Sequence, residues 1–197
     1  SIFNDYTITD KADGLRKLLY IHTDNFAYMV DYSTMAIENT GVKHEDVGSI
    51  LDGEYITESK LGNSIKLFAC FDIYYHKGEN VARMPLYIKG DKEDSRIGLM
   101  KKMYKKGFSD VQKTGMKIVI KSFEYGGDKG QKIYKMCDKI YNNTPRNYNI
   151  DGLIFTPASL GVGQNFEKDK PNISKRTWES VMKWKPLPTI DFLVRFI

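Results

Sequence analysis

The chain has 197 residues, of which 41% are hydrophobic and 13% aromatic, so it can bury a core and is not an intrinsically disordered segment. Lys and Arg number 30 against 25 Asp and Glu, a net charge of +5 that permits a polyanionic partner without requiring one. The sequence has no apolar run of roughly 20 residues and no signal-peptide pattern, so we expect no membrane contact. Its two cysteines lack metal-type spacing, which favours reduced thiols in an intracellular protein.

The first 80 residues are predicted to consist mainly of strands. A turn at 23–25 joins two of them as a hairpin. A charged turn beginning at Lys11 follows the first strand, and a polar segment at 76–80 closes the last one. The expected strands are Tyr6 to Ile8, Leu18 to His22, Phe26 to Asp31, Ile50 to Ile56 and Ile65 to Tyr75.

The rest of the chain adds two predicted helices. Ile97, Met100 and Tyr104 recur at helical spacing within Ser95 to Lys106, and Gly107 stands where a C-cap is expected. The second helix is predicted over Lys129 to Tyr141. Strands are expected at Met116 to Tyr125, Ile150 to Phe155, Thr177 to Lys185 and Ile190 to Phe196, with a polar turn at 142–149 and a charged loop at 165–175.

Strands outnumber helices in this order and do not alternate regularly with them. That pattern favours an α+β fold of largely antiparallel sheets with flanking helices over a doubly wound parallel sheet. The sequence contains no evident linker, so residues 1–197 are expected to form a single domain.

The segment Lys11-Ala12-Asp13-Gly14-Leu15-Arg16 carries a lysine, a carboxylate and an arginine around a glycine. A lysine amine attacks a phosphate only when it is neutral, and nearby cations favour the neutral form. Arg16, with Lys183 and Lys185, would supply such cations and hold phosphates, while Asp13 would orient the amine or a metal. A solvated β-turn is the alternative interpretation.

Asp52-Gly53-Glu54 places two carboxylates on one face of a strand, with a glycine that would let a ligand approach the backbone. Glu54 could accept hydrogen bonds from ribose hydroxyls; a solvent-facing acidic strand is the alternative. Phe71, before Asp72, could stack on a purine base, or it could simply pack in the core.

Asp151 begins a hydrophobic strand, and a carboxylate in that position could bind a hard cation such as Mg²⁺ together with phosphates. A turn aspartate is the alternative. Lys183 and Lys185 lie two residues apart and share one face of a predicted strand, where they would form an anion site. The alternative is an edge strand whose lysines prevent aggregation.

In this order the five motifs resemble the covalent nucleotidyltransferase superfamily of capping enzymes and polynucleotide ligases, over nearly the whole chain. The resemblance implies a nucleotidyltransferase core of the ATP-grasp-like, DNA ligase type. The arginine at 16, the Lys183-Trp184-Lys185-Pro186 run and the following Thr189-Ile190-Asp191-Phe192 favour an mRNA guanylyltransferase over a ligase. Lys121-Ser122-Phe123 resembles the segment in which capping enzymes place a lysine against guanine.

The resemblance implies a role for each of these residues. Lys11 would be the nucleophile that carries GMP, and Asp13 would orient it. Arg16 and Glu54 would hold the ribose, Phe71 would stack on guanine, and Lys121 would contact it. Lys183 and Lys185 would bind phosphate, Asp151 would act on a metal-bound phosphate, and Asp151 with Glu54 would be the metal ligands.

The implied substrates are GTP and a 5′-diphosphate RNA end, with Mg²⁺ or Mn²⁺ as cofactor. The family also has a downstream oligonucleotide-binding-fold domain, which is expected to be absent here, and triphosphatase or methyltransferase domains are possible partners in a parent protein. The expected location is the nucleus or the cytoplasm. The cytoplasm is expected if the composition, rich in Lys, Asn, Ile and Tyr, reflects the genome of a large DNA virus. A ligase adenylation domain and a nucleotide-binding fragment inactive without the further domain are the alternatives.

Overall fold

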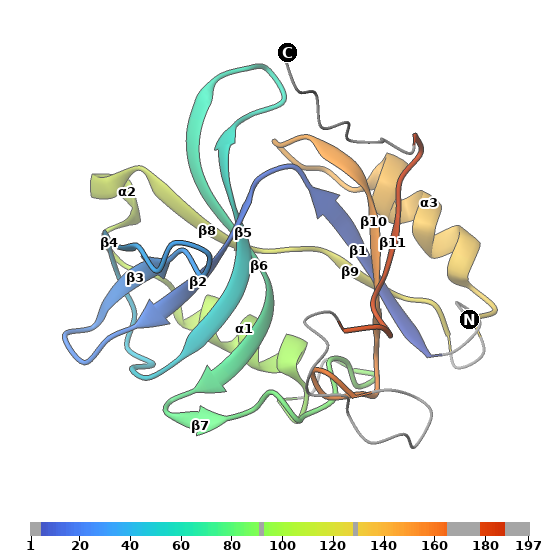
Figure 1. Ribbon diagram of the computed structural model, residues 1–197, viewed down its shortest axis with the longest axis horizontal. Coiled ribbons are helices and arrows are strands. Elements are labelled where there is room, and N and C mark those ends of the chain that lie inside the picture. Colours follow the sequence, from blue (N-terminus) through green and yellow to red (C-terminus); the bar gives the residue numbers. More distant parts are fainter. Residues whose placement is uncertain (1–4, 91–92, 128–129, 165–177, 188–197) are drawn as a thin grey trace, which may run out of the picture.

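The computed structural model describes residues 5–90, 93–127, 130–164 and 178–187. Two sheets lie side by side, joined by the connections between them (Figure 1). The smaller sheet has the strand order β11-β10-β1-β9. Its strands are β1 (Tyr6–Ala12), β9 (Phe123–Tyr125), β10 (Ile150–Pro157) and β11 (Met182–Trp184).

The larger sheet has the order β4-β3-β2-β5-β6-β7, and β8 pairs with β6. Among the described strand pairs, β6 with β8 is parallel and the others are antiparallel, so the expected largely antiparallel α+β fold is confirmed. The strands are β2 (Leu15–Ile21), β3 (Phe26–Val30), β4 (Ile37–Lys43), β5 (Ile50–Glu58), β6 (Ser64–His76), β7 (Glu79–Asn80) and β8 (Met116–Ile120).

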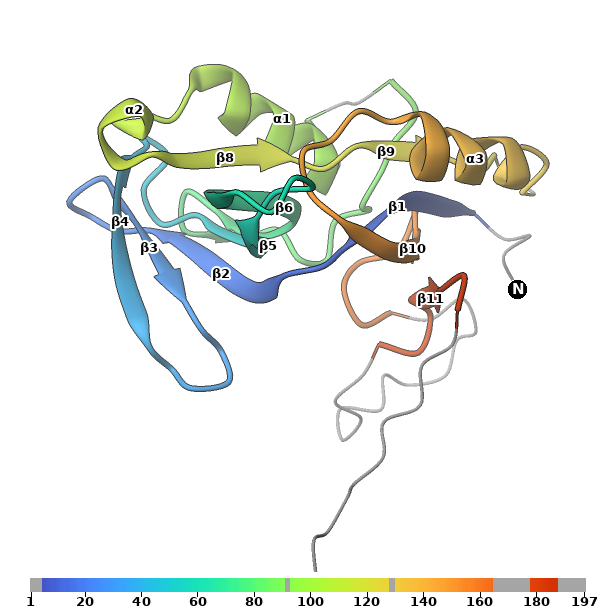
Figure 2. The same cartoon turned by 90° about the horizontal axis from the view of Figure 1, so that it is seen from above.

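Each sheet is covered by a helix (Figure 2). α1 (Arg96–Lys106) packs on β6 and β8, and α3 (Ile133–Asn143) packs on β1, β9 and β10. Helix α1 is capped at its N-terminus by Ser95, whose side chain accepts a hydrogen bond from the Gly98 amide, and at its C-terminus by Gly107 with φ of 91°. The short α2 (Val111–Thr114) precedes β8. In the described part of the chain, no helix is both long and apolar enough to span a bilayer.

The hydrophobic core has three parts. One lies under the larger sheet and α1, and a second lies between the smaller sheet and α3. The third joins the two sheets: Ala12 of β1 and Tyr148 pack with Ile56 of β5 and Leu67 and Ala69 of β6. This third cluster fixes the position of one sheet against the other.

Several predicted boundaries differ from the structure. Lys11 belongs to β1 rather than to the following turn, because β1 pairs with β10 as far as Ala12. The single strand predicted over Met116 to Tyr125 is two strands, β8 and β9, which belong to different sheets and break at Lys121 and Ser122. The break occurs where the chain leaves β6 to pair with β1.

Other differences are omissions or changes of length. Strand β4 and helix α2 were not predicted; β4 is polar and contains Gly41, and α2 is a single turn. The predicted Thr177–Lys185 strand is confined to β11, since residues 178–181 form a turn closed by the Val181 amide and the Trp178 carbonyl oxygen. The second helix starts at Ile133. The predicted 165–175 loop, the 190–196 strand and Thr189 to Phe192 lie outside the described residues.

Candidate nucleotide-binding site

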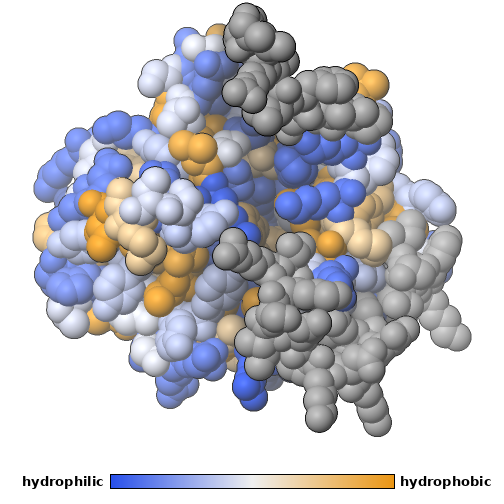
Figure 3. All heavy atoms as spheres, viewed as in Figure 1, coloured by the Kyte–Doolittle hydropathy of each residue, from blue (hydrophilic) through white to orange (hydrophobic). Residues whose placement is uncertain are grey.

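The predicted site residues come together where the two sheets meet. The chain leaves the smaller sheet after β1, turns at Asp13 and Gly14, and enters the larger sheet as β2. A side chain on Gly14 would lie 2.7 Å from the Tyr55 carbonyl oxygen and 2.8 Å from Glu54 Cγ, so only glycine fits at this crossing. The crossing places Lys11 and Arg16 on adjacent sheets. A hollow lies in this face of the molecule (Figure 3).

The Lys11 amine is held by a carboxylate from the neighbouring strand. Lys11 Nζ donates to both Asp151 oxygens, at 2.7 and 2.8 Å, and Lys185 Nζ lies 3.2 Å from Asp151 Oδ2. Asp151 sits in a β-bulge opposite the end of β1, which turns its side chain toward Lys11. Partial burial alone raises the pKa of Asp151, but hydrogen bonds from Lys11 and Lys185 outweigh it and leave the pKa below its ordinary value.

Strand β11 reaches this carboxylate because Gly152 allows it. A side chain on Gly152 (φ 155°) would lie 1.9 Å from the Trp184 carbonyl oxygen. The close approach of β11 to β10 brings Lys185 to Asp151. Lys183 is exposed on the same strand and forms no ion pair with a described residue.

On the larger sheet, Arg16 is fixed by a buried carboxylate. Its guanidinium donates through Nε at 3.0 Å and through NH2 at 2.5 Å to Asp52, and the Tyr74 hydroxyl donates to the same carboxylate. Burial and the neighbouring Asp52 raise the pKa of Tyr74. Arg16 therefore presents a positive charge at the site from a rigid support.

Phe71 lies between two cations. The Arg16 guanidinium carbon is 5.7 Å and the Lys121 amine 5.4 Å from the centre of its half-buried ring. Phe71 is the extra residue of a bulge in β6, because Asp52 pairs with Asp72 and Gly53 with Cys70. Asp72, by contrast, forms an ion pair with the fully buried Arg96 and is structural.

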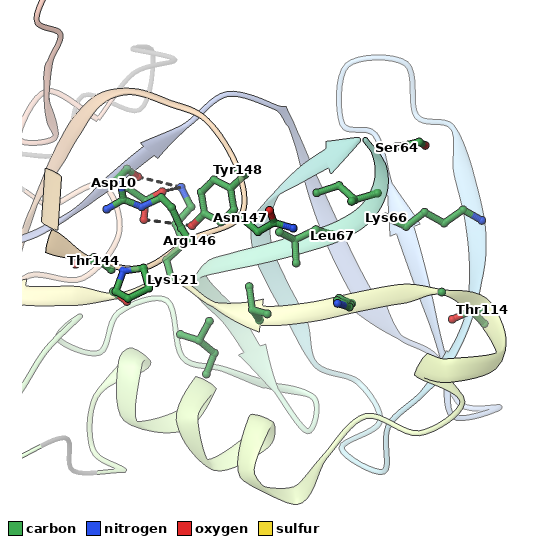
Figure 4. A pocket seen from close by; sticks show the side chains of 17 residues that line it. Asp10, Ser64, Lys66, Leu67, Thr114, Lys121, Thr144, Arg146, Asn147 and Tyr148 are labelled. Carbon is green, nitrogen blue, oxygen red and sulfur yellow. Dashed lines mark hydrogen bonds and ion pairs between the residues drawn. The ribbon is translucent and has the colours of Figure 1, made fainter. Parts of the chain in front are cut away.

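Lys121 is buried at the break between β8 and β9. Its amine donates to the Asp10 carbonyl oxygen at 3.0 Å and lies 3.4 Å from Asp10 Oδ2, while the Tyr148 hydroxyl donates to Oδ1 (Figure 4). Burial lowers the pKa of Lys121, against the attraction of Asp10 and Glu54. Lys121 and Asp10 also line a cavity of about 570 Å³ that opens between the 144–148 loop and the start of β6.

Glu54 faces the same group of cations. The described hydrogen bonds do not involve its carboxylate, and its pKa is raised by burial although Lys121 and Lys11 act in the opposite direction. A partly buried carboxylate without a fixed partner is available to a ligand. The described residues contain no group of three or more His, Cys, Asp or Glu side chains gathered as a metal site.

Asp13 and Gly53 have the following surroundings in the structure. Asp13 is exposed, and the described contacts of Lys11 are with Asp151 and not with Asp13, whose amide instead donates to the Asn149 carbonyl oxygen. Gly53 serves packing rather than ligand approach, because a side chain there would lie 2.5 Å from the Phe68 ring. The sequence reasoning also missed Asp10 and Tyr74. Asp10 could have been found, because it is a carboxylate inside an apolar strand. The bulge that carries Tyr74 had no signal in the sequence.

The chain is similar to known proteins over most of its length. A family model described as the mRNA capping enzyme, catalytic domain, matches residues 3–187. The mRNA-capping enzyme of African swine fever virus (isolate Tick/South Africa/Pretoriuskop Pr4/1996) is 29% identical over 192 residues, covering 96% of this chain and 18% of that protein. The mRNA-capping enzyme subunit alpha of Schizosaccharomyces pombe is 27% identical over 221 residues, covering 97% and 48%. The chain spans less than half of either relative.

Two solved structures share the fold. The ligase domain of LigD from M. tuberculosis superposes with a TM-score of 0.50 at 14% identity, covering 92% of this chain and 53% of that one. The chain named Pmar-Lig_PreS3 gives a TM-score of 0.52 at 18% identity, covering 94% and 43%. The expected ligase-type nucleotidyltransferase fold is thereby confirmed.

Proposed function

The chain belongs to the mRNA capping enzyme catalytic-domain family, and from this premise we propose that it is an mRNA guanylyltransferase domain acting through Lys11. It would form a covalent lysine–GMP intermediate from GTP and pass GMP to a 5′-diphosphate RNA end. The named relatives are longer than this chain, so the activity, the substrates and the RNA partner all belong to the proposal.

The observation that carries the proposal is the Lys11 amine, held at 2.7 and 2.8 Å by Asp151 beside Lys185. In the first step the Lys11 amine would lose its proton to solvent and its nitrogen would bond to the α-phosphorus of GTP. The bond from that phosphorus to the bridging oxygen would break, releasing pyrophosphate. In the second step a β-phosphate oxygen of the RNA would displace Lys11 and restore the free amine. Lys185 and Lys183 would stabilise negative charge on the phosphates.

The base and ribose would occupy the space beside the larger sheet. Phe71 offers a half-buried ring for stacking on guanine, and Lys121 offers N–H groups beside that ring. Arg16, held by Asp52, and Glu54, which the described hydrogen bonds leave free, would bind the ribose hydroxyls. Asp13, which is exposed, would act at the mouth of the site and orient Lys11 only after movement of the turn.

Mg²⁺ or Mn²⁺ would fit Asp151 and Glu54 in this proposal, because their hard oxygen atoms are suitable ligands and nucleotide sites often use one or two carboxylates together with phosphates. Such an ion would offset phosphate charge when bound. Lys11 and Lys185 both pair with Asp151, so in this proposal they would exchange the carboxylate for phosphate when nucleotide binds.

Incubation of the chain with α-labelled GTP or ATP and Mg²⁺ or Mn²⁺, followed by a denaturing gel, tests the proposal. Label is expected from GTP and should disappear in Lys11→Ala but persist in Lys60→Ala, an exposed lysine outside the site. Label from ATP alone would indicate a ligase-type adenylation domain. Calorimetric GTP binding without any label would instead support a nucleotide-binding module.

A further inference from the structure

An aromatic side chain outside the predicted motifs lies next to Arg16. The Arg16 guanidinium carbon is 5.7 Å from the ring centre of Tyr32 and 5.7 Å from that of Phe71. The guanidinium therefore contacts both rings. Tyr32 is 55% exposed, whereas Phe71 is half-buried, so the Phe71–Arg16–Tyr32 series leads from the interior of the site to its rim.

The segment that carries Tyr32 is ordered by local hydrogen bonds. Asp31 Oδ1 accepts from the Ser33 amide at 2.9 Å, the Ser33 hydroxyl at 2.6 Å and the Thr34 amide at 3.2 Å. Lys17 Nζ lies 3.9 Å from the other Asp31 oxygen. A ring held out from a fixed turn can bind a flat partner with little loss of conformational entropy.

The surroundings of Tyr32 combine apolar surface with positive charge. Leu15, Met35 and Ile37, from the same corner of the larger sheet, are 59%, 70% and 66% exposed. Arg16 adds a cation whose side chain is 51% exposed. The β3–β4 hairpin projects on the same side of the molecule as β11, which carries Lys183 and is followed directly by Lys185 (Figure 2). Aromatic rings interleaved with cations are typical of single-stranded nucleic-acid binding.

We propose that Tyr32 is the stacking platform for the 5′-terminal base of the acceptor RNA. This inference rests on the proposed function, because it assigns the second substrate to the rim of the same site. Phe71 would hold the donor base inside, Arg16 would separate the two bases and meet phosphate, and Tyr32 would receive the acceptor base outside. The bases of the two substrates would then lie along one continuous row of side chains, from which both substrates reach Lys11.

The test measures GMP transfer from protein that already carries labelled GMP, so that the rate of lysine–GMP formation does not affect the result. Two acceptors are compared at varied concentration: a short 5′-diphosphate RNA and the same RNA with an abasic first nucleotide. Tyr32→Ala should raise the RNA concentration for half-maximal transfer by about tenfold with the normal RNA and by less than about twofold with the abasic one, as loss of one base stack predicts. Tyr32→Phe should behave as the wild type, as should Tyr104→Ala, which removes an exposed tyrosine from α1.

Equal weakening of both acceptors would overturn the proposal, because Tyr32 would then act by supporting Arg16. Unchanged transfer in Tyr32→Ala would overturn it as well. If the wild-type protein takes no label, the proposed function fails, and fluorescence anisotropy with the same two RNAs still decides the inference. Tyr32→Ala must then lose affinity for the normal RNA and not for the abasic one; equal affinities of wild type and variant would refute the stacking role.

Discussion

At the scale of single residues, the buried pair of Lys121 and Asp10 determines what faces Phe71. Both side chains are 1% exposed, and the Tyr148 hydroxyl adds one hydrogen bond to the carboxylate. A charge in such a place is costly without its partner. The pair can therefore hold an amine beside the Phe71 ring only while both members are present.

We predict that Lys121→Met and Asp10→Asn each lower the free energy of unfolding. The loss should be about 3 kcal/mol for Lys121→Met, because this change leaves a buried carboxylate without its cation. The double variant should lose clearly less than the sum. Urea denaturation followed by tryptophan fluorescence measures all three. Lys66→Met, an exposed lysine on the same cavity, is the control and should change little. Strictly additive losses would show that the two charges do not interact.

A second residue-scale prediction concerns pH. Hydrogen bonds from Ser33 and Thr34 lower the pKa of Asp31 to about 2. A lowered carboxylate pKa means that the stabilisation of the 31–36 turn is complete above the ordinary value near ~4 and is lost as pH falls toward about 2. The carboxyl carbon of Asp31 should titrate with that low midpoint by NMR, and Ser33→Ala should move it upward. A midpoint at the ordinary value would mean that the turn is not formed in solution.

The residue types of the site were predictable, and part of their grouping was too. Lys11, Asp151 and Lys185 were assigned to one site from motif order, and the structure brings them within hydrogen-bonding distance. The partner of each charge was not predictable. Arg16 pairs with Asp52, and Lys121 with Asp10, because strand register decides these contacts and single-sequence patterns do not reveal it.

At the scale of elements, β-bulges orient three of the side chains at the site. Phe71, Tyr74 and Asp151 each occupy the position skipped in their strand pairing. An extra residue shifts the side chains that follow it to the opposite face, so simple alternation fails there. Sequence alternation alone therefore does not give the direction of these three side chains. The break at Lys121 escaped prediction because the chain changes partner there, from β6 in one sheet to β1 in the other.

Strand β11 depends on a glycine in its neighbour. Gly152→Ala should displace β11 from β10, because the added carbon would lie 1.9 Å from the Trp184 carbonyl oxygen. We therefore expect lysine–GMP formation to fall by about tenfold or more as Lys185 leaves Asp151, consistent with a misplaced phosphate ligand. In a Lys185→Ala background the same change should add little. If the two substitutions lowered lysine–GMP formation independently, Gly152 would not act through the position of Lys185.

At the scale of the whole molecule, the two sheets are joined by a shared apolar cluster. Ala12 and Tyr148 from one side meet Ile56 and Leu67 from the other. Because this cluster packs directly against the β1–β2 crossing, the site and the joint between the sheets are parts of one structure. A change in the cluster should alter the cooperativity of unfolding as well as its free energy.

The wild-type chain should accordingly unfold in a single transition, and Ile56→Ala, which truncates a side chain that is 1% exposed, should lower the free energy of unfolding by about 2–5 kcal/mol. Hydrogen exchange should show the β1–β10 amides of the smaller sheet opening before those of β5 and β6 in this variant. Truncation of Leu61, which is 83% exposed, is the control. Two separate transitions in the wild type would mean that the sheets are independent units.

The most direct measurement is the position of the covalent nucleotide. The chain is incubated with GTP and a divalent metal, digested, and analysed by tandem mass spectrometry under conditions that preserve the phosphorus–nitrogen bond. The account predicts one GMP per chain, attached to Lys11, the amine that Asp151 holds beside Lys185. GMP on another residue, or an adduct that persists in Lys11→Ala, would contradict it.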